Sequence, residues 1–182
     1  MNCDLHHPWE VSPKEGIAIQ NRLRTAVVRR DQLGVIRCAA GVDVGFPRRR
    51  GTTRAAVAVL DSPSLGPLEQ AIVEVPTRFS YIPGLLSFRE VPAVLEALAR
   101  LSKTPDLMLC DGQGIAHPRR LGIASHVGVL TDIPAIGVAK SRLVGRHDPV
   151  PDTRGAWVPL VDRGEILGAV LRTRQGVKPL FI

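Results

Sequence analysis

Three acidic residues each stand in or beside a stretch of apolar sequence. Asp43 lies within the apolar segment 35–46, Asp111 ends the apolar segment 106–111, and Glu90 falls in the first turn of an expected helix. Singly, each has an ordinary explanation: a hydrogen bond to a turn, a cap on a loop, or attraction to a helix N-terminus. Together, three oxygen donors without accompanying cysteines suit a hard cation, Mg²⁺ or Mn²⁺. Such an ion binds phosphate groups, so the chemistry would be phosphodiester hydrolysis.

Two basic loops follow the expected strands that end near these acids. Segment 117–120 reads HPRR, and segment 139–146 reads AKSRLVGR. Lys140 stands at the end of the expected strand 134–140. If this strand is parallel to the strand that ends at Asp111, Lys140 lies at the same edge of the sheet as Asp111 and could contact a phosphate. His117 lies among arginines and is a candidate for ligand contact, whereas His126 falls in an apolar helix and is expected to be structural.

Tyr81 is the single tyrosine of the chain and lies between an expected strand and the helix that carries Glu90. Beside Pro83 and Gly84, its ring could wedge into a base stack, as side chains do in enzymes that extrude a nucleotide. The alternative is a tyrosine that covers the edge of the core. Gly84 and Gly122 could bring backbone groups close to a ligand, although such glycines more often serve turns.

Composition and charge restrict the class of protein. The 182 residues are 45% hydrophobic and 23% charged, which is ordinary for a single globular domain. No apolar stretch approaches the roughly 20 residues of a membrane span, and the N-terminus lacks the pattern of a signal peptide. Three scattered cysteines predict no disulfide framework and favour the cytoplasm. A net charge of +7 favours nucleic acid as a partner, with a merely solvated basic surface as the alternative.

The periodicity of apolar residues predicts an α/β fold with a mixed central sheet, in which an antiparallel meander adjoins parallel strands flanked by helices. Ser12, Pro13 and Glu15 have the pattern of a helix N-terminus. The expected helices are 12–33, 87–101 and 121–132, the expected strands are 35–46, 53–61, 68–77, 106–111 and 134–140, and 156–173 is expected to form a hairpin that turns at DRGE.

Four strings in order resemble the motif series of the endonuclease V family: GVDVGF, YIPGLLSFRE, DGQGIAHPRRLGIASH and IPAIGVAKSRL, between about residues 36 and 145. The resemblance implies a ribonuclease H-like fold over 1–182 and Mg²⁺-dependent cleavage, with Mn²⁺ as a substitute. The implied substrate is DNA containing deoxyinosine, cut at the second phosphodiester bond 3′ to it to leave 3′-hydroxyl and 5′-phosphate ends. Inosine in RNA is a further implied substrate, and we expect a monomer.

The same resemblance implies roles for single residues. Asp43 and Asp111 would be metal ligands, and Glu90 would be the third catalytic acid. The other implied contacts are with nucleic acid: Tyr81 and Pro83 in the wedge, Gly84, Leu85, Gly122 and Ile123 lining the hypoxanthine pocket largely through backbone groups, and His117 and Lys140 near the DNA and its cleaved phosphate.

The sequence departs from the family pattern in two places. Ser80 stands where the family commonly has proline, which should matter little. The family continues beyond the equivalent of KPLFI with a Gly-His segment and a last helix, whereas this sequence ends at Ile182. We therefore expect no residue here to take the role of that histidine. Two alternatives remain open: a chain that binds inosine but cuts little, and a ribonuclease H-like nuclease for branched or hybrid duplexes.

Overall fold

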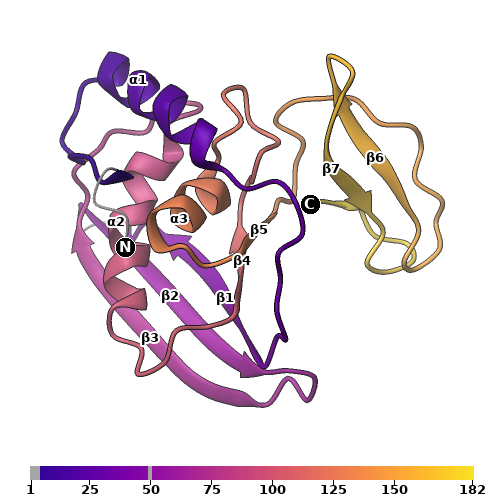
Figure 1. Ribbon diagram of the computed structural model, residues 1–182, viewed down its shortest axis with the longest axis horizontal. Coiled ribbons are helices and arrows are strands. Elements are labelled where there is room, and N and C mark those ends of the chain that lie inside the picture. The colour runs from indigo at the N-terminus through magenta and orange to yellow at the C-terminus, as the bar shows by residue number, and fades with distance from the viewer. Residues whose placement is uncertain (1–4, 49–50) are drawn as a thin grey trace.

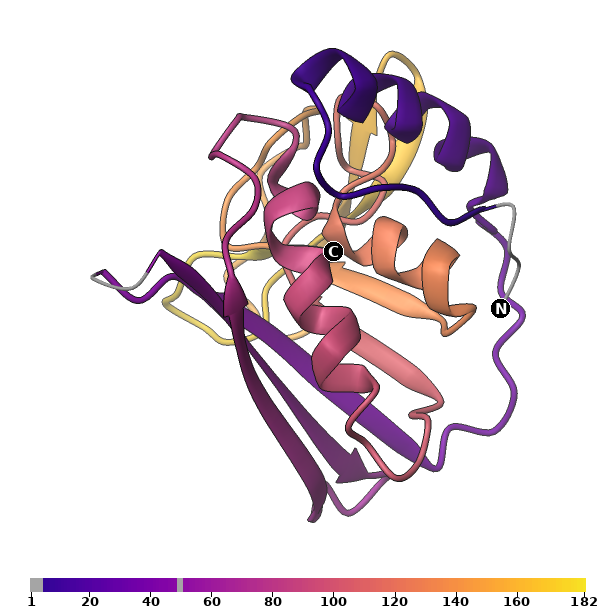
Figure 2. The same cartoon turned by 90° about the vertical axis from the view of Figure 1, so that its left-hand side faces the viewer.

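The core is a five-stranded mixed sheet whose buried face is covered by helices (Figures 1 and 2). The computed structural model describes residues 5–48 and 51–182. The strand order is β3-β2-β1-β4-β5; β1, β2 and β3 pair antiparallel, and β1, β4 and β5 pair parallel. The predicted mixed sheet is thereby confirmed. The strands are β1 (Cys38–Gly45), β2 (Thr52–Asp61), β3 (Pro67–Pro76), β4 (Leu107–Asp111) and β5 (Ala135–Val138), and the covering helices are α2 (Leu86–Leu98) and α3 (Ile123–Thr131).

Alternation along the strands decides which side chains enter the core. In β1, Ala40 and Val42 are buried, while in β4 Met108 and Cys110 are buried, and all four belong to one cluster with α2 and α3. Because successive side chains on a strand point to opposite faces, the residues between them are turned out of this core. Asp43 and Asp111 occupy such positions.

Helix α1 (Pro13–Leu23) begins as the sequence predicts but ends early. The Ser12 side chain accepts from the Glu15 N–H and the Glu15 side chain accepts from the Ser12 N–H, which forms the expected capping box. A 3₁₀ turn, η2 (Arg24–Ala26), follows, so the prediction of a helix to residue 33 is wrong in its last third. Further helix would bury little, since Val28 is exposed, and short helices depend on burial of one face.

A small second sheet, order β6-β7-β8, packs beside the first (Figure 1). It contains β6 (Trp157–Asp162), β7 (Glu165–Leu171) and β8 (Leu180–Phe181), and the β6–β7 hairpin turns where the sequence predicts. Phe181 forms a bridge with Ala139, just beyond β5, which ties the two sheets together. In the described part of the chain, no helix has the length and apolar character needed to cross a membrane.

Candidate active site

Asp43 and Asp111 lie on neighbouring parallel strands near their C-terminal ends. The last pair in the register of β1 with β4 is Val42 with Cys110, and each aspartate directly follows one member of that pair. Neighbouring strands are about 4.8 Å apart. The two carboxylates therefore start from adjacent backbones, and both line a single cavity.

Glu90 contributes a third carboxylate to this cavity from the N-terminal half of α2. Its side chain is buried, with 7% of the residue exposed. Burial, followed by the negative charges of Asp111 and Asp43, raises the pKa of Glu90 to about 7. Three carboxylates that interact in this way need a proton or a cation to balance their charge.

Lys140 provides a cation at the same place. Its Nζ donates to Oδ2 of Asp111 at 2.5 Å, from a position two residues beyond β5. The hydrogen bond and the charge of Asp111, with a smaller effect of Asp43, raise the pKa of Lys140, so that it stays an ammonium. Its side chain is 78% exposed, which leaves the remaining donors accessible to a phosphate.

The cavity has a volume of about 480 Å³, within the usual range of small-molecule sites. The structure brings together ten of the eleven residues that the sequence and its resemblance single out. Tyr81, 65% exposed, and Pro83 lie at the cavity on the segment that precedes α2. The complete set of predicted residues in the lining is Asp43, Tyr81, Pro83, Gly84, Glu90, Asp111, His117, Gly122, Ile123 and Lys140.

Leu85 is the exception, because it does not line the cavity. Its side chain is buried in a small cluster with Phe79 and Phe88. Its backbone is also engaged, since its N–H donates to the Ile82 carbonyl and its carbonyl accepts from the Phe88 N–H. Leu86 lines the cavity instead. The prediction for Leu85 is corrected accordingly: the chain enters α2 at this point and directs the first of the two leucines into the core.

The carbonyl of Gly84 organises one wall of the cavity. It accepts from Nε2 of Gln20 at 3.0 Å, from Nε2 of His117 at 3.1 Å and from Nη2 of Arg119 at 2.5 Å. Gln20 also accepts from Nε of Arg119 through its side-chain oxygen. Gly84 has φ +78°, and a Cβ there would stand 2.7 Å from Nη2 of Arg119. Only glycine meets both requirements without strain.

His117 lines the cavity with both ring nitrogens engaged in the protein. Nδ1 accepts from the Arg119 N–H at 3.2 Å, so the proton of the neutral ring is on Nε2, which donates to Gly84. Burial, and next the charge of Arg119, lowers the pKa of His117 to about 4. At neutral pH the ring is therefore uncharged, and its hydrogen bonds connect Gly84 with the loop that carries Arg119.

Close backbone contacts shape the turn that follows Asp111. The Gly122 N–H donates to the Gly114 carbonyl at 2.8 Å. A Cβ at Gly122 would lie 2.3 Å from the Gln113 oxygen, and a Cβ at Gly137 would lie 2.2 Å from the Gly114 nitrogen. These glycines let the turn, the start of α3 and β5 approach more closely than any side chain would permit.

Arg120 connects this region to the second sheet. Its guanidinium donates to the His117 carbonyl at 3.0 Å, to Asp162 at 2.8 Å and to Glu165 at 2.8 Å. The last two acids flank the turn of the β6–β7 hairpin. The hairpin therefore supports the loop that carries His117.

His126 has the structural role that the sequence predicts. It is fully buried, and Nδ1 and Nε2 lie 2.9 Å from Ser87 Oγ and 2.8 Å from His7 Nε2. Because His7 donates through Nδ1 to the Pro8 carbonyl, its Nε2 is an acceptor. His126 therefore donates to His7 and accepts from Ser87, which ties the N-terminal segment to α2 and α3.

Sequence reasoning missed the polar residues that position the cavity wall. Gln20 is buried on the docked face of α1 together with Gly16 and Leu23. The local sign that Gln20 is buried is its helical spacing from Gly16 and Leu23, which places the three residues on one face of the helix. Arg119 and Arg120 are visible in sequence as charge, but Gln20, Gly84 and Asp162, to which their guanidinium groups donate, lie 35 to 99 residues away.

A model of the Endonuclease V family matches residues 21–182. The chain belongs to the endonuclease V family. Endonuclease V of Trichormus variabilis is 58% identical over 177 residues, which cover 97% of this chain and 80% of that protein. Endonuclease V of Roseiflexus sp. is 54% identical over 182 residues, covering 100% of this chain and 81% of its relative.

Solved endonuclease V structures share the fold. The structure from Streptomyces avermitilis superimposes with a TM-score of 0.89 at 41% identity, covering 95% of this chain and 77% of that one. Endonuclease V from Ciona intestinalis, crystallised with a 24-mer DNA containing an inosine followed by a ribo-adenosine, gives a TM-score of 0.80 at 26% identity. The coverage in that case is 92% of this chain and 80% of the other.

The donor set at the cavity fits a hard divalent cation. Within residues 5–48 and 51–182, no three His, Cys, Asp or Glu side chains form a ready-made ligand group. Mg²⁺ does not require one, since it is commonly bound through one or two carboxylates, with phosphate oxygens and waters completing the shell. Asp43 and Asp111 on adjacent strands supply such a pair, and a cation there would offset the repulsion that acts on Glu90.

Proposed function

We propose that the protein is a metal-dependent endonuclease that recognises deoxyinosine in DNA and hydrolyses the second phosphodiester bond on its 3′ side, leaving 3′-hydroxyl and 5′-phosphate ends. The observation that carries the proposal is that three interacting carboxylates, a lysine and the Tyr81 segment line one cavity. Membership of the endonuclease V family and the inosine-containing DNA bound by the Ciona relative support it.

Asp43 and Asp111 are the residues that would hold Mg²⁺, with Mn²⁺ as a substitute. When bound, the ion would acidify a water and offset the charge of the phosphate. Glu90, buried in the same cavity, is the acid placed to exchange a proton with that water. The Lys140 ammonium is placed to pair with a phosphate oxygen beside the bond that is cut.

Recognition of the base would use backbone groups at the start of α3. Ile123 is the first residue of α3, and the N–H groups at a helix N-terminus lack partners within the helix. We expect such a group to donate to the oxygen of hypoxanthine. Tyr81 would fill the space that the extruded base leaves in the stack.

A cleavage assay tests the proposal. A duplex with a single deoxyinosine and a matched adenine duplex are incubated with the protein and Mg²⁺, and the products are mapped to single nucleotides. We expect one cut in the inosine strand, its loss in Asp43→Ala, and relaxed selectivity in Tyr81→Ala. Equal cutting of the adenine duplex, or unchanged cutting by Asp43→Ala, would overturn the proposal. Tight inosine binding without any cutting would favour the binding-protein alternative.

Inosine in RNA is a second candidate substrate, because the DNA bound by the Ciona relative carries a ribonucleotide directly after the inosine. Single-turnover rates on otherwise identical DNA, RNA and chimeric strands would rank the two. A faster cut of the chimeric strand than of all-DNA would indicate contact with a 2′-hydroxyl.

A further inference from the structure

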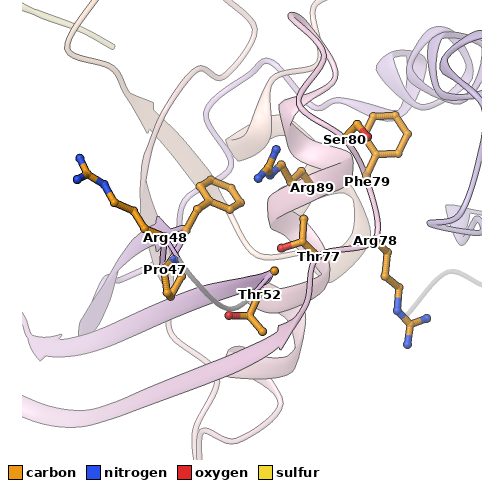
Figure 3. Close-up of a pocket in the computed structure, with 10 residues that line it drawn as sticks. Pro47, Arg48, Thr52, Thr77, Arg78, Phe79, Ser80 and Arg89 are labelled. Carbon is orange, nitrogen blue, oxygen red and sulfur yellow. The ribbon is translucent and has the colours of Figure 1, made fainter.

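A second cavity, of about 450 Å³, is rich in arginine (Figure 3). We call it the arginine cavity. It has three arginines and, among its described lining residues, no acid. The lining is Phe46, Pro47, Arg48, Gly51, Thr52, Thr77, Arg78, Phe79, Ser80 and Arg89.

The two cavities share their walls. On α2, Glu90 faces the catalytic cavity and Arg89, the preceding residue, faces the arginine cavity. In the segment before α2, Ser80 lines the arginine cavity and Tyr81 lines the catalytic cavity. A strand held at one cavity therefore passes close to the other.

Arg89 is the residue whose chemistry points most directly to a ligand. Its guanidinium lies over the ring of Phe46, 4.2 Å from the centroid, which fixes its plane. Its Nε is buried and has no hydrogen-bond partner among the described residues. A buried donor without an acceptor is unfavourable, and structures seldom retain one without a reason.

Arg48 and Arg78 extend the positive charge to the rim of the cavity. Figure 3 shows their guanidinium groups directed outward from opposite sides, with Arg89 between them. Arg78 pairs with Glu10 at 3.2 Å, but both side chains are more than half exposed, and such pairs are weak. Arg78 can therefore exchange this partner for another anion at little cost.

We propose that the arginine cavity binds a backbone phosphate of the substrate strand, a few nucleotides away from the bond that is cut. The inference rests on the proposed function, because it takes nucleic acid as the substrate. Arginine guanidinium groups match phosphate oxygens in geometry and charge, and three of them stand at this one cavity. From Asp43 to Pro47 the chain spans at most about 13 Å. At a rise of about 3.4 Å per nucleotide along the axis of a duplex, this upper limit corresponds to at most about four nucleotide steps.

The salt dependence of binding tests this site. Binding of a fluorescent deoxyinosine duplex is measured between 50 and 200 mM NaCl, with Ca²⁺ in place of Mg²⁺, for the wild type and Arg48→Ala. Loss of one phosphate contact should reduce the slope of log K against log salt by about 0.9. Over this range the variant should then lose about 3.5-fold less affinity than the wild type. Arg100→Ala, two residues beyond the C-terminal end of α2 and exposed, is the matched control and should leave the slope unchanged.

Neutral linkages locate the contact on the strand. One methylphosphonate is placed at successive positions of the inosine strand, and binding is compared between the wild type, Arg48→Ala and Arg89→Lys. We expect one position, apart from the scissile bond, where the wild type loses affinity and both variants are insensitive. An unchanged slope in Arg48→Ala together with equal losses at every position in all three proteins would overturn the inference. Failure of the proposed function is seen separately, as a wild type that does not distinguish inosine from adenine.

Discussion

Replacing Glu90 with glutamine should stabilise the metal-free protein at alkaline pH. The pKa of Glu90 is about 7 in the folded chain, against an ordinary value of 4.5, because of its burial and the charges of Asp111 and Asp43. Between these two values the folded protein binds a proton that the unfolded chain has released, so stability falls as pH rises. At about 1.36 kcal/mol per pKa unit, the full penalty above pH 7 is about 3 kcal/mol. Glutamine carries no charge, so the Glu90→Gln variant does not incur this penalty.

Urea unfolding in EDTA at several pH values measures this effect. The free energy of unfolding of Glu90→Gln minus that of the wild type should be near its minimum at pH 4 and rise by about 3 kcal/mol by pH 8. Glu96→Gln, an exposed position on the same helix, serves as the control and should show no such rise. A difference for Glu90→Gln that stays constant from pH 4 to pH 8 would refute the claim that the three carboxylates interact.

Three further predictions concern the framework of the site. Gly137→Ala should destabilise the protein by about 2 kcal/mol or more in thermal unfolding, since its Cβ would meet the backbone of a neighbouring turn. Gly41→Ala, with open space around the new Cβ, is the control and should be neutral. Equal melting temperatures of the two variants would contradict this prediction. The pKa of His126 is lowered to about 3, so its neutral form is favoured in the fold and its contribution to stability is lost as pH falls below about 6.5. His126→Phe should therefore flatten the decline in stability between pH 6.5 and 4 in urea titrations, and an unchanged slope would count against it. Arg120→Ala removes two ion pairs and should lower stability by about 2 kcal/mol, with faster proteolysis at the β6–β7 turn; full protection there would show that the hairpin is held by other contacts.

The sequence alone predicts much of the site because strand alternation, turn residues and helix caps are local properties. Asp43 and Asp111 follow buried residues of two apolar segments, and the strand–helix–strand pattern of 106–140 predicts that the Asp111 strand and the strand after it are parallel. The pairing of the Asp43 strand with the Asp111 strand comes from the structure. The capping box at Ser12 and the β6–β7 turn are likewise read from a few adjacent residues.

The rest depends on contacts between distant segments, which no local pattern encodes. Helix α1 ends where its buried face ends, and on that face Gly16 and Gln20 contact residues 84–88 and 121, far along the chain. The choice between Leu85 and Leu86 depends on where α2 starts. The arginine cavity forms only when the end of β1, the end of β3 and α2 come together.

Anomalous diffraction from crystals soaked in Mn²⁺ would locate the catalytic ion. If Asp43 and Asp111 bind one catalytic ion, the strongest anomalous peak will lie in the catalytic cavity within about 2.3 Å of an oxygen of each aspartate, and Asp43→Ala crystals will lack it. A peak elsewhere, or none at these residues in a protein that still cuts inosine-containing DNA, would contradict the account.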